Sequence, residues 1–208
     1  AALALGAADA LPKPGTGRFN GRFSEILLGR LKALGYADHH EALPAPVSAP
    51  ALKSPLRALP LEPMAVLAIG ASTGGIHALN SFFEALPSRI GVPILVTQHL
   101  PAPFMPVFAR QLAVASKREA LVAEPGMKLL PDRVLIAPGD AHLIVEDSPS
   151  GPVVGLSHEA ALSGCMPSLD PMLESVGALY GPAAIGVVLT GMGRDGLRGA
   201  GRLVEVGG

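Results

Sequence analysis

The sequence is poor in cysteine and in net charge, and it lacks long apolar runs. Its one cysteine, Cys165, cannot form a disulfide within the chain and is too few for a metal site built on several thiolates. A free cysteine fits a reducing cytoplasm, which is the expected location. No apolar run reaches the roughly 20 residues that span a bilayer, so we expect no membrane insertion. A formal net charge of −1 gives no electrostatic reason to expect nucleic acid as a partner.

The 208 residues divide into two parts around a stretch without glycine. From Glu41 to Pro63 the chain is rich in Pro, Ala and Leu, which is typical of an extended linker. We therefore predict a short N-terminal piece over residues 1–36, a linker over 37–63 and one domain over 64–208. The chain is 49% hydrophobic, so this domain can bury a substantial core.

Apolar runs alternate with helical patterns in the predicted domain. Continuous apolar runs, typical of buried strands, lie at 64–70, 92–99, 133–139 and 183–193. Helical spacing lies at 76–87, 104–116, 168–181 and after Gly196, and a hairpin is predicted over 142–159. Ser168 is a suitable N-cap, with Pro171 in the first turn and Gly181 at the end. This alternation predicts an α/β fold, doubly wound, with a mostly parallel sheet and helices on both faces.

Three chemically useful residues follow three different apolar runs. Ser72 follows VLAIGA, His99 follows ILVTQ, and Asp195 follows VVLTGMGR. The carboxyl ends of parallel strands meet at one edge of a sheet, so these side chains are expected to gather there. A serine hydroxyl becomes a nucleophile when an imidazole accepts its proton and a carboxylate orients that imidazole.

The pattern alone leaves other interpretations open. A serine in a glycine-rich turn often only eases the turn, a lone histidine is often structural, and an aspartate in GRDG can be a helix cap. A phosphate cradle is disfavoured, because GASTGG lacks the Lys-Ser/Thr ending of a P-loop and the G-x-G-x-x-G spacing. The other histidines show no metal-ligand spacing, so neither a metal nor a cofactor is expected; they are His39, His40, His77, His142 and His158.

The motifs IGASTGG, TQHLP and VLTGMGRDG, in this order, resemble the catalytic domain of chemotaxis protein-glutamate methylesterases of the CheB type. The segments VLIAPGDAHLIV and MPSLDPMLESV also look like that family, and the likeness covers residues 64–208. The chain order Ser, His, Asp differs from the Ser, Asp, His order of α/β-hydrolases, which disfavours an ordinary lipase or esterase.

The resemblance implies a role for each matching residue. Ser72 would be the nucleophile, His99 the general base and then acid, and Asp195 the orienting carboxylate. The backbone N–H of Met192 would contribute to the oxyanion hole, and Thr73 would line the site. The implied substrates are glutamate γ-methyl esters on the cytoplasmic domain of methylated chemoreceptors, with deamidation of receptor glutamines as a second activity. No cofactor is implied.

The N-terminal piece has a resemblance of its own. ALGAADALPKP and FSEILLGRLKALG resemble the last strand and last helix of a response-regulator receiver domain. Lys13 matches the phosphate-contacting lysine of that family, and Lys13–Pro14 is a candidate cis peptide. The resemblance implies a chemotaxis histidine kinase as the phosphodonor of the intact parent. We expect a chain truncated at both ends, so the family resemblance does not by itself make this chain active.

Two alternatives from other classes stay open at this point. One is a non-catalytic module that binds or scaffolds a receptor complex. The other is a nucleotide-binding α/β domain. The distances among Ser72, His99 and Asp195 decide whether the catalytic hypothesis survives, because a general base must lie within hydrogen-bond reach of its nucleophile.

Overall fold

A computed structural model describes Leu28, residues 62–189 and residues 193–208, and every structural statement below concerns these residues. The chain divides into two units, residues 1–56 and residues 57–208, and the second contains the predicted domain. Among the described residues, no helix is both long and apolar enough to cross a membrane.

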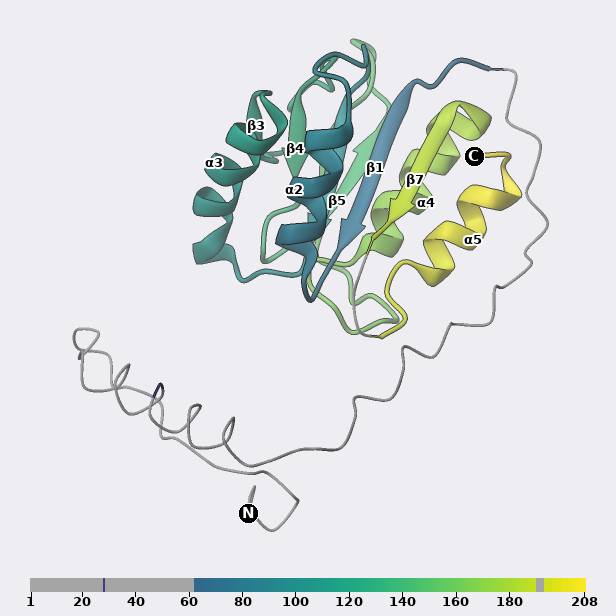
Figure 1. Cartoon of the computed structure of the whole chain (residues 1–208). Coiled ribbons are helices and arrows are strands. Elements are labelled where there is room, and N and C mark those ends of the chain that lie inside the picture. Colours follow the sequence, from purple (N-terminus) through teal and green to yellow (C-terminus); the bar gives the residue numbers. More distant parts are fainter. Residues whose placement is uncertain (1–27, 29–61, 190–192) are drawn as a thin grey trace, which may run out of the picture. The chain divides into compact units, whose positions relative to one another are not determined.

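A parallel sheet forms the centre of the described region, with its strands in the order β3-β4-β2-β1-β7 (Figure 1). The strands are β1 (Val66–Ala71), β2 (Ile94–Gln98), β3 (Ala120–Val122), β4 (Val134–Ile136) and β7 (Ala184–Val188). All four neighbouring pairs run parallel. The chain leaves β1 toward β2 and later returns to the other side of β1 as β7. The strand order therefore switches direction at β1, which is where open α/β sheets carry their sites.

Helices cover both faces of this sheet, as predicted (Figure 1). They are α2 (Gly75–Ala85), α3 (Met105–Ser116), α4 (Leu169–Tyr180) and α5 (Leu197–Glu205), with short 3-10 turns η2 (Ala102–Phe104) and η3 (Gly181–Ala183). Successive residues of β1 point to opposite faces. Leu67 and Ile69 join a core with α2 and α3, whereas Val66 and Ala68 join a core with α4 and α5. Both faces of β1 are thus buried, which explains its continuous apolar run.

The predicted hairpin is a separate antiparallel pair, β5 (His142–Glu146) and β6 (Val153–Ser157). Its apolar side chains Leu143 and Val154 belong to the same core as α4. The hairpin leads directly into the segment that begins α4. It therefore supports the helix end on which part of the site is built.

The predicted ends of α4 are confirmed. The hydroxyl of Ser168 accepts a hydrogen bond from the backbone N–H of Asp170 as N-cap, and Gly181 ends the helix. The peptide bond between Met166 and Pro167, just before the cap, is cis.

Strand β3 is absent from the sequence prediction. Its three residues are half-buried at the edge of the sheet, where they pair with β4 alone. A run this short has no measurable period of its own, so its pairing is set by the neighbouring strand. The predicted receiver remnant over 1–36, with Lys13 and the Lys13–Pro14 bond, lies outside the described residues apart from Leu28, as does nearly all of the 37–63 linker. Both stay predictions.

Candidate active site

The three predicted catalytic residues come from the carboxyl ends of three adjacent strands. Ser72 follows β1 directly, His99 follows β2 directly, and Asp195 follows β7 after the turn that leads to α5. β1 pairs with both β2 and β7, so all three ends lie at one edge of the sheet. The register brings Ala71 opposite Gln98, which places the residues that follow them side by side. Sheet topology therefore assembles the set predicted from the sequence.

The three side chains form a continuous hydrogen-bonded relay. His99 Nδ1 lies 2.9 Å from Ser72 Oγ, and His99 Nε2 lies 2.8 Å from Asp195 Oδ2. An ionised carboxylate only accepts hydrogen bonds. Nε2 therefore carries the ring proton and donates a hydrogen bond to Asp195. Nδ1 is then the free acceptor for the Ser72 hydroxyl. In the chymotrypsin template the imidazole Nε2 faces the serine and Nδ1 faces the aspartate. Here the two nitrogens exchange partners, while the imidazole keeps its place between the serine and the carboxylate.

The carboxylate of Asp195 is held from several sides. Its side chain is only 5% exposed, against 22% for that of His99. Burial favours the neutral acid, but hydrogen bonds from His99, Ser168, the backbone of Leu169, and Ser163 outweigh burial and hold the pKa of Asp195 well below its usual range. The residue is therefore a permanent anion at neutral pH, as an orienting carboxylate must be.

The N-terminus of α4 provides two of these hydrogen bonds. Leu169 N–H donates to Asp195 Oδ2 at 2.8 Å, and Ser168 Oγ donates to Asp195 Oδ1 at 2.5 Å. The first N–H groups of a helix have no partner inside the helix and lie at the positive end of its dipole, so they bind an anion well. The N-terminus of α4 thus binds the Asp195 carboxylate as it would bind an anionic ligand.

Buried His142 fixes the position of Ser168 in turn. The backbone N–H of Ser168 donates to His142 Nδ1 at 2.8 Å, so Nε2 carries the ring proton and donates to the carbonyl of Glu159, also at 2.8 Å. Both His142 and Ser168 are completely buried. The sequence placed His142 only beside the hairpin; the structure makes it a support behind the relay.

The turn that carries Ser72 is held by Gln98. Gln98 Nε2 donates to the carbonyl of Ser72 at 2.9 Å, and the backbone N–H of Gly75 donates to the same oxygen at 2.7 Å. A Cβ at Gly75 would lie 2.1 Å from Gln98 Oε1, so this position requires glycine for the glutamine to fit. Gly74, with a φ of 76°, caps α2 in the left-handed region that favours glycine. The glycines of the motif therefore shape the serine turn.

A cleft of about 560 Å³ opens beside the relay. The turn after β1, the first residues of α2 and the end of β2 line this cleft, and the lining includes Ser72, Thr73 and His99. The positive end of the α2 dipole faces the cleft, where it would stabilise negative charge on a substrate oxygen. Thr73 thus lines the cleft beside Ser72 and His99. Met192, the expected oxyanion donor, lies outside the described residues and stays a prediction.

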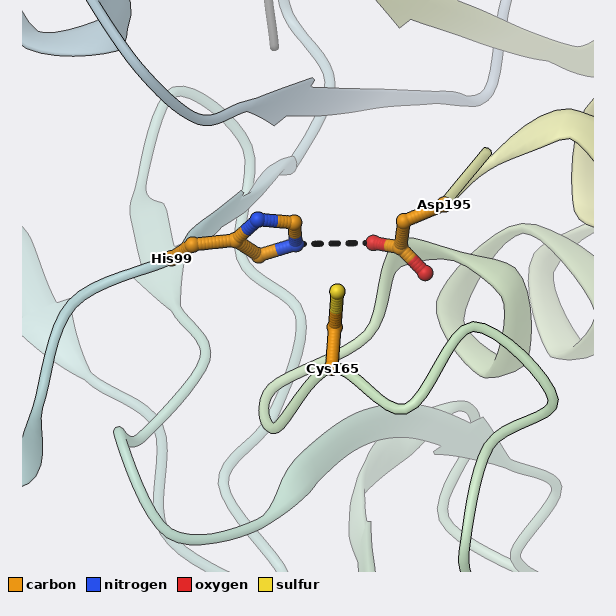
Figure 2. Close-up of side chains that lie close together, drawn as sticks. All are labelled: His99, Cys165 and Asp195. Carbon is orange, nitrogen blue, oxygen red and sulfur yellow. Dashed lines mark hydrogen bonds and ion pairs between the residues drawn. The ribbon is translucent and has the colours of Figure 1, made fainter. Parts of the chain in front are cut away.

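Cys165 approaches the relay from the segment between β6 and α4. One ligand atom from each of His99, Cys165 and Asp195 lies within 4.8 Å of the others, and the Cys165 sulfur points toward the gap between the imidazole and the carboxylate (Figure 2). Linear spacing concealed this neighbour, because 66 and 30 residues separate Cys165 from the other two positions.

Several supporting residues were missed by sequence reasoning. Gln98 had a signal, since it stands immediately before His99 at the end of a strand. Ser168 was predicted only as a helix cap, and nothing local indicates that its hydroxyl also contacts a residue 27 positions away. Of the histidines named in the sequence analysis, His99 is the one that hydrogen-bonds both Ser72 and Asp195 among the described residues.

Comparisons with known proteins agree on one family. The family model described as CheB methylesterase matches residues 67–208. A protein-glutamate methylesterase/protein-glutamine glutaminase of Paramagnetospirillum magneticum is 35% identical over the whole of this chain and 61% of its own length. Another, from Anaeromyxobacter dehalogenans, is 39% identical over 99% of this chain and 57% of its own length. This chain therefore spans about three fifths of the length of these relatives.

A solved structure supports the same relationship at the level of the fold. The crystal structure of the CheB methylesterase catalytic domain of Thermotoga maritima matches with a TM-score of 0.67 and 34% sequence identity. The match covers 70% of this chain and 77% of that domain. It is consistent with the parallel sheet and two-faced helical covering described above.

Proposed function

The chain belongs to the CheB methylesterase family, and from this premise we propose that it hydrolyses glutamate γ-methyl esters of chemoreceptors as a serine hydrolase. The observation that carries the proposal is the relay from Ser72 Oγ through His99 to Asp195, with both hydrogen bonds below 3 Å. A general base in direct contact with the nucleophile, and itself oriented by a buried carboxylate, is the arrangement that acyl transfer requires.

In the first step Ser72 Oγ attacks the ester carbonyl carbon while its proton passes to His99 Nδ1. The resulting imidazolium is stabilised by the Asp195 carboxylate at Nε2. Negative charge then develops on the carbonyl oxygen, and the N-terminal end of α2 lies beside the cleft to stabilise it. When the tetrahedral intermediate collapses, His99 Nδ1 returns the proton to the methoxy oxygen and methanol leaves.

In the second step water replaces methanol. His99 Nδ1 takes a proton from the water as the water oxygen attacks the acyl carbon, and the same proton returns to Ser72 Oγ when that bond breaks. The products are free Ser72 and a glutamate γ-carboxyl group. With a glutamine substrate the sequence is the same, but ammonia replaces methanol as the leaving group.

The proposed biological setting follows the family. The relatives are named for two activities, methylesterase on protein glutamate and glutaminase on protein glutamine. We place the substrate on the cytoplasmic domain of methylated chemoreceptors and the protein itself in the cytoplasm. A chemotaxis histidine kinase would be the phosphodonor of a receiver domain joined to this catalytic domain. The cleft of about 560 Å³ beside Ser72 has room for a side chain presented by a protein surface.

Methanol release from a methylated receptor cytoplasmic domain tests the proposal. We expect Asp195→Asn to lower kcat by about ten-thousandfold, and Ser72→Ala and His99→Ala to lower it by at least as much. Ser81→Ala, at an exposed position on α2, is the matched control and should retain the full rate.

Three results would contradict the proposal. A Ser72→Ala protein that still releases methanol at the unaltered rate would remove the nucleophile from the mechanism. A protein that binds the receptor domain without any methanol or ammonia release would favour the non-catalytic binding module. Thermal stabilisation by nucleotide, with none by ester substrates, would instead favour the nucleotide-binding alternative.

A further inference from the structure

The thiol of Cys165 lies at the side of the His99–Asp195 hydrogen bond (Figure 2). We propose that His99, Cys165 and Asp195 form a binding site for a borderline-soft divalent ion, with Zn²⁺ as the natural example, and that the bound ion inhibits the hydrolase. The site itself stands on geometry and donor chemistry alone. Its effect on the rate rests on the proposed function.

The donor set is suited to zinc. One imidazole nitrogen, one sulfur and one carboxylate oxygen are the three ligand types that Zn²⁺ uses in proteins, and three protein ligands leave a fourth position for water. Hard ions such as Mg²⁺ prefer several oxygens, and this set offers one carboxylate. The combination therefore selects zinc, cobalt or copper over magnesium.

The distances require only a local adjustment. The three ligand atoms already lie within 4.8 Å of one another, and His99 Nε2 is 2.8 Å from Asp195 Oδ2. Tetrahedral coordination at about 2.0–2.3 Å separates ligand atoms by roughly 3.3–3.8 Å. The His99–Asp195 pair must open slightly while the Cys165 sulfur moves in. Cys165 is half-buried, and its sulfur makes a long contact of 3.9 Å to the Ser163 carbonyl.

Hydrogen bonds from the surrounding protein already hold the Asp195 carboxylate in place for a metal ion. Asp195 is fixed by Ser168 Oγ and Leu169 N–H, which do not depend on its bond to His99. Ligand carboxylates and imidazoles in metal sites are held in the same way by hydrogen bonds from the surrounding protein. The ion would therefore replace one hydrogen bond of Asp195 and leave the others in place.

Inhibition follows from the proton balance. An ion at His99 Nε2 needs the lone pair there, so the single ring proton moves from Nε2 to Nδ1. Nδ1–H then points at Ser72 Oγ and cannot accept its proton, which removes the general base. Cys165 binds as a thiolate and gives its proton to the buffer, so about one proton is released for each ion bound.

Cobalt binding to the whole chain tests the site without any enzyme assay. Because the sequence has one cysteine, a cobalt–thiolate charge-transfer band on titration with Co²⁺ can only come from Cys165. We expect this band, tetrahedral visible bands, and zinc competition for them. Ser72→Ala leaves all three ligands in place and should keep the band. His77→Ala, which removes a neighbouring histidine of the cleft, is the matched control and should keep it too.

The ligand variants should weaken binding. We expect Cys165→Ser and Asp195→Asn to bind Zn²⁺ at least tenfold more weakly by calorimetry, since even the outer partners of metal ligands contribute about 10- to 100-fold. In the methanol assay, with each protein normalised to its own metal-free rate, the zinc concentration for half inhibition should rise at least tenfold in Cys165→Ser. Mg²⁺ should have no such effect.

The outcomes separate the two proposals. A charge-transfer band in a protein that releases no methanol keeps the metal site and rejects the hydrolase. Hydrolysis without a thiolate band, or zinc binding of equal strength in wild type and Cys165→Ser, rejects the metal site and keeps the hydrolase. A thiolate band that appears without any zinc inhibition of an active enzyme overturns the inhibitory role.

Discussion

Ser168 donates its hydroxyl hydrogen to the Asp195 carboxylate while the same hydroxyl oxygen accepts the backbone N–H of Asp170. One side chain thus caps α4 and anchors the orienting carboxylate of the relay. The two roles are compatible because a hydroxyl has one donor and two acceptor positions. Helix capping and catalytic geometry are therefore coupled at a single atom, and substitutions can separate them.

Replacing Ser168 should affect stability and rate by different amounts in two variants. Ser168→Ala loses the cap, worth about 1 kcal/mol, and the bond to a charged group, worth about 1.5–3 kcal/mol. Ser168→Gly keeps most of the cap, because glycine at this position costs only a few tenths of a kcal/mol relative to serine. Both variants lose the anchor of Asp195, so kcat should fall roughly 10- to 100-fold in both.

Urea unfolding and methanol-release kinetics on the two variants check this coupling. Ser81→Ala provides the exposed control and should change neither property by much. If Ser168→Gly kept the wild-type kcat, the hydroxyl would be a helix cap and nothing more. Equal stability of Ser168→Ala and Ser168→Gly would show that the capping role is unimportant.

The site residues that could be predicted are marked by the local sequence, whereas the missed residues depend on contacts that form only on folding. Ser72, His99 and Asp195 were predictable because each follows an apolar run, and parallel strands bring such positions together. The supports of Asp195 were not predictable, because they depend on where α4 docks. Cys165 reached the relay through a loop of irregular backbone, for which no periodic pattern exists.

Gln98 should act as a positioning residue for the nucleophile. Gln98→Met keeps the length of the side chain but removes the donor to the Ser72 carbonyl. The Ser72 carbonyl then keeps the hydrogen bond from Gly75 N–H but loses the one from residue 98, so we expect about 1 kcal/mol lower stability and a roughly tenfold lower kcat. Because the lost bond goes to the backbone of the enzyme, KM should change less than kcat.

The same substitution at an exposed glutamine of α3 provides the control for Gln98→Met. Gln111→Met is exposed and should leave kcat and stability near wild type. Steady-state kinetics on both variants distinguish positioning from substrate binding. A large rise in KM with unchanged kcat for Gln98→Met would assign the side chain to the substrate instead.

The fold was predictable where strands carry continuous apolar runs. β1, β2 and β4 lie within such runs and are buried throughout, since strands covered on both faces need apolar residues at every position. β7 also lies within a predicted apolar run, although most of its residues are half-buried or exposed. β3 has three half-buried residues and gains its strand geometry from β4, which lies next to it only after folding. The sequence of β3 therefore does not need a continuous apolar run.

Gly70 should be intolerant of a methyl group. A Cβ there would lie 2.0 Å from Leu169 Cδ2, and Leu169 is the residue whose N–H binds Asp195. Gly70→Ala should therefore cost about 1–3 kcal/mol from overpacking and also lower kcat. Gly201→Ala on α5, where a Cβ meets open space, should stabilise by up to about 1 kcal/mol. Denaturant midpoints test both, and a Gly70→Ala protein of wild-type stability and rate would refute the predicted clash.

Asp132 is not part of the relay or its supports. We expect its carboxyl group to make the free energy of unfolding depend on pH. Its carboxylate accepts backbone hydrogen bonds from Ile90 at 2.7 Å and Gly91 at 3.2 Å, and Arg118 lies 3.9 Å away. The Ile90 bond is the largest cause that lowers the pKa of Asp132, opposed by burial and reinforced by Gly91, Arg118 and Arg89. A lowered folded pKa means that the unfolded chain binds the proton more readily. The stabilisation is therefore complete above the unfolded value of about 3.9 and is lost as pH falls through the lower folded value.

Asp132→Asn isolates the charge in this prediction. Asparagine tolerates the positive φ of 60° at this position and keeps an acceptor oxygen for Ile90. We expect wild type to melt at a higher temperature than Asp132→Asn at pH 7, and the gap to close as the pH is lowered below about 4. Asp147→Asn, at an exposed carboxyl after β5, should show no comparable gap. A difference in Tm that stays constant from pH 7 to pH 3 would mean that the variant acts through packing and not through charge.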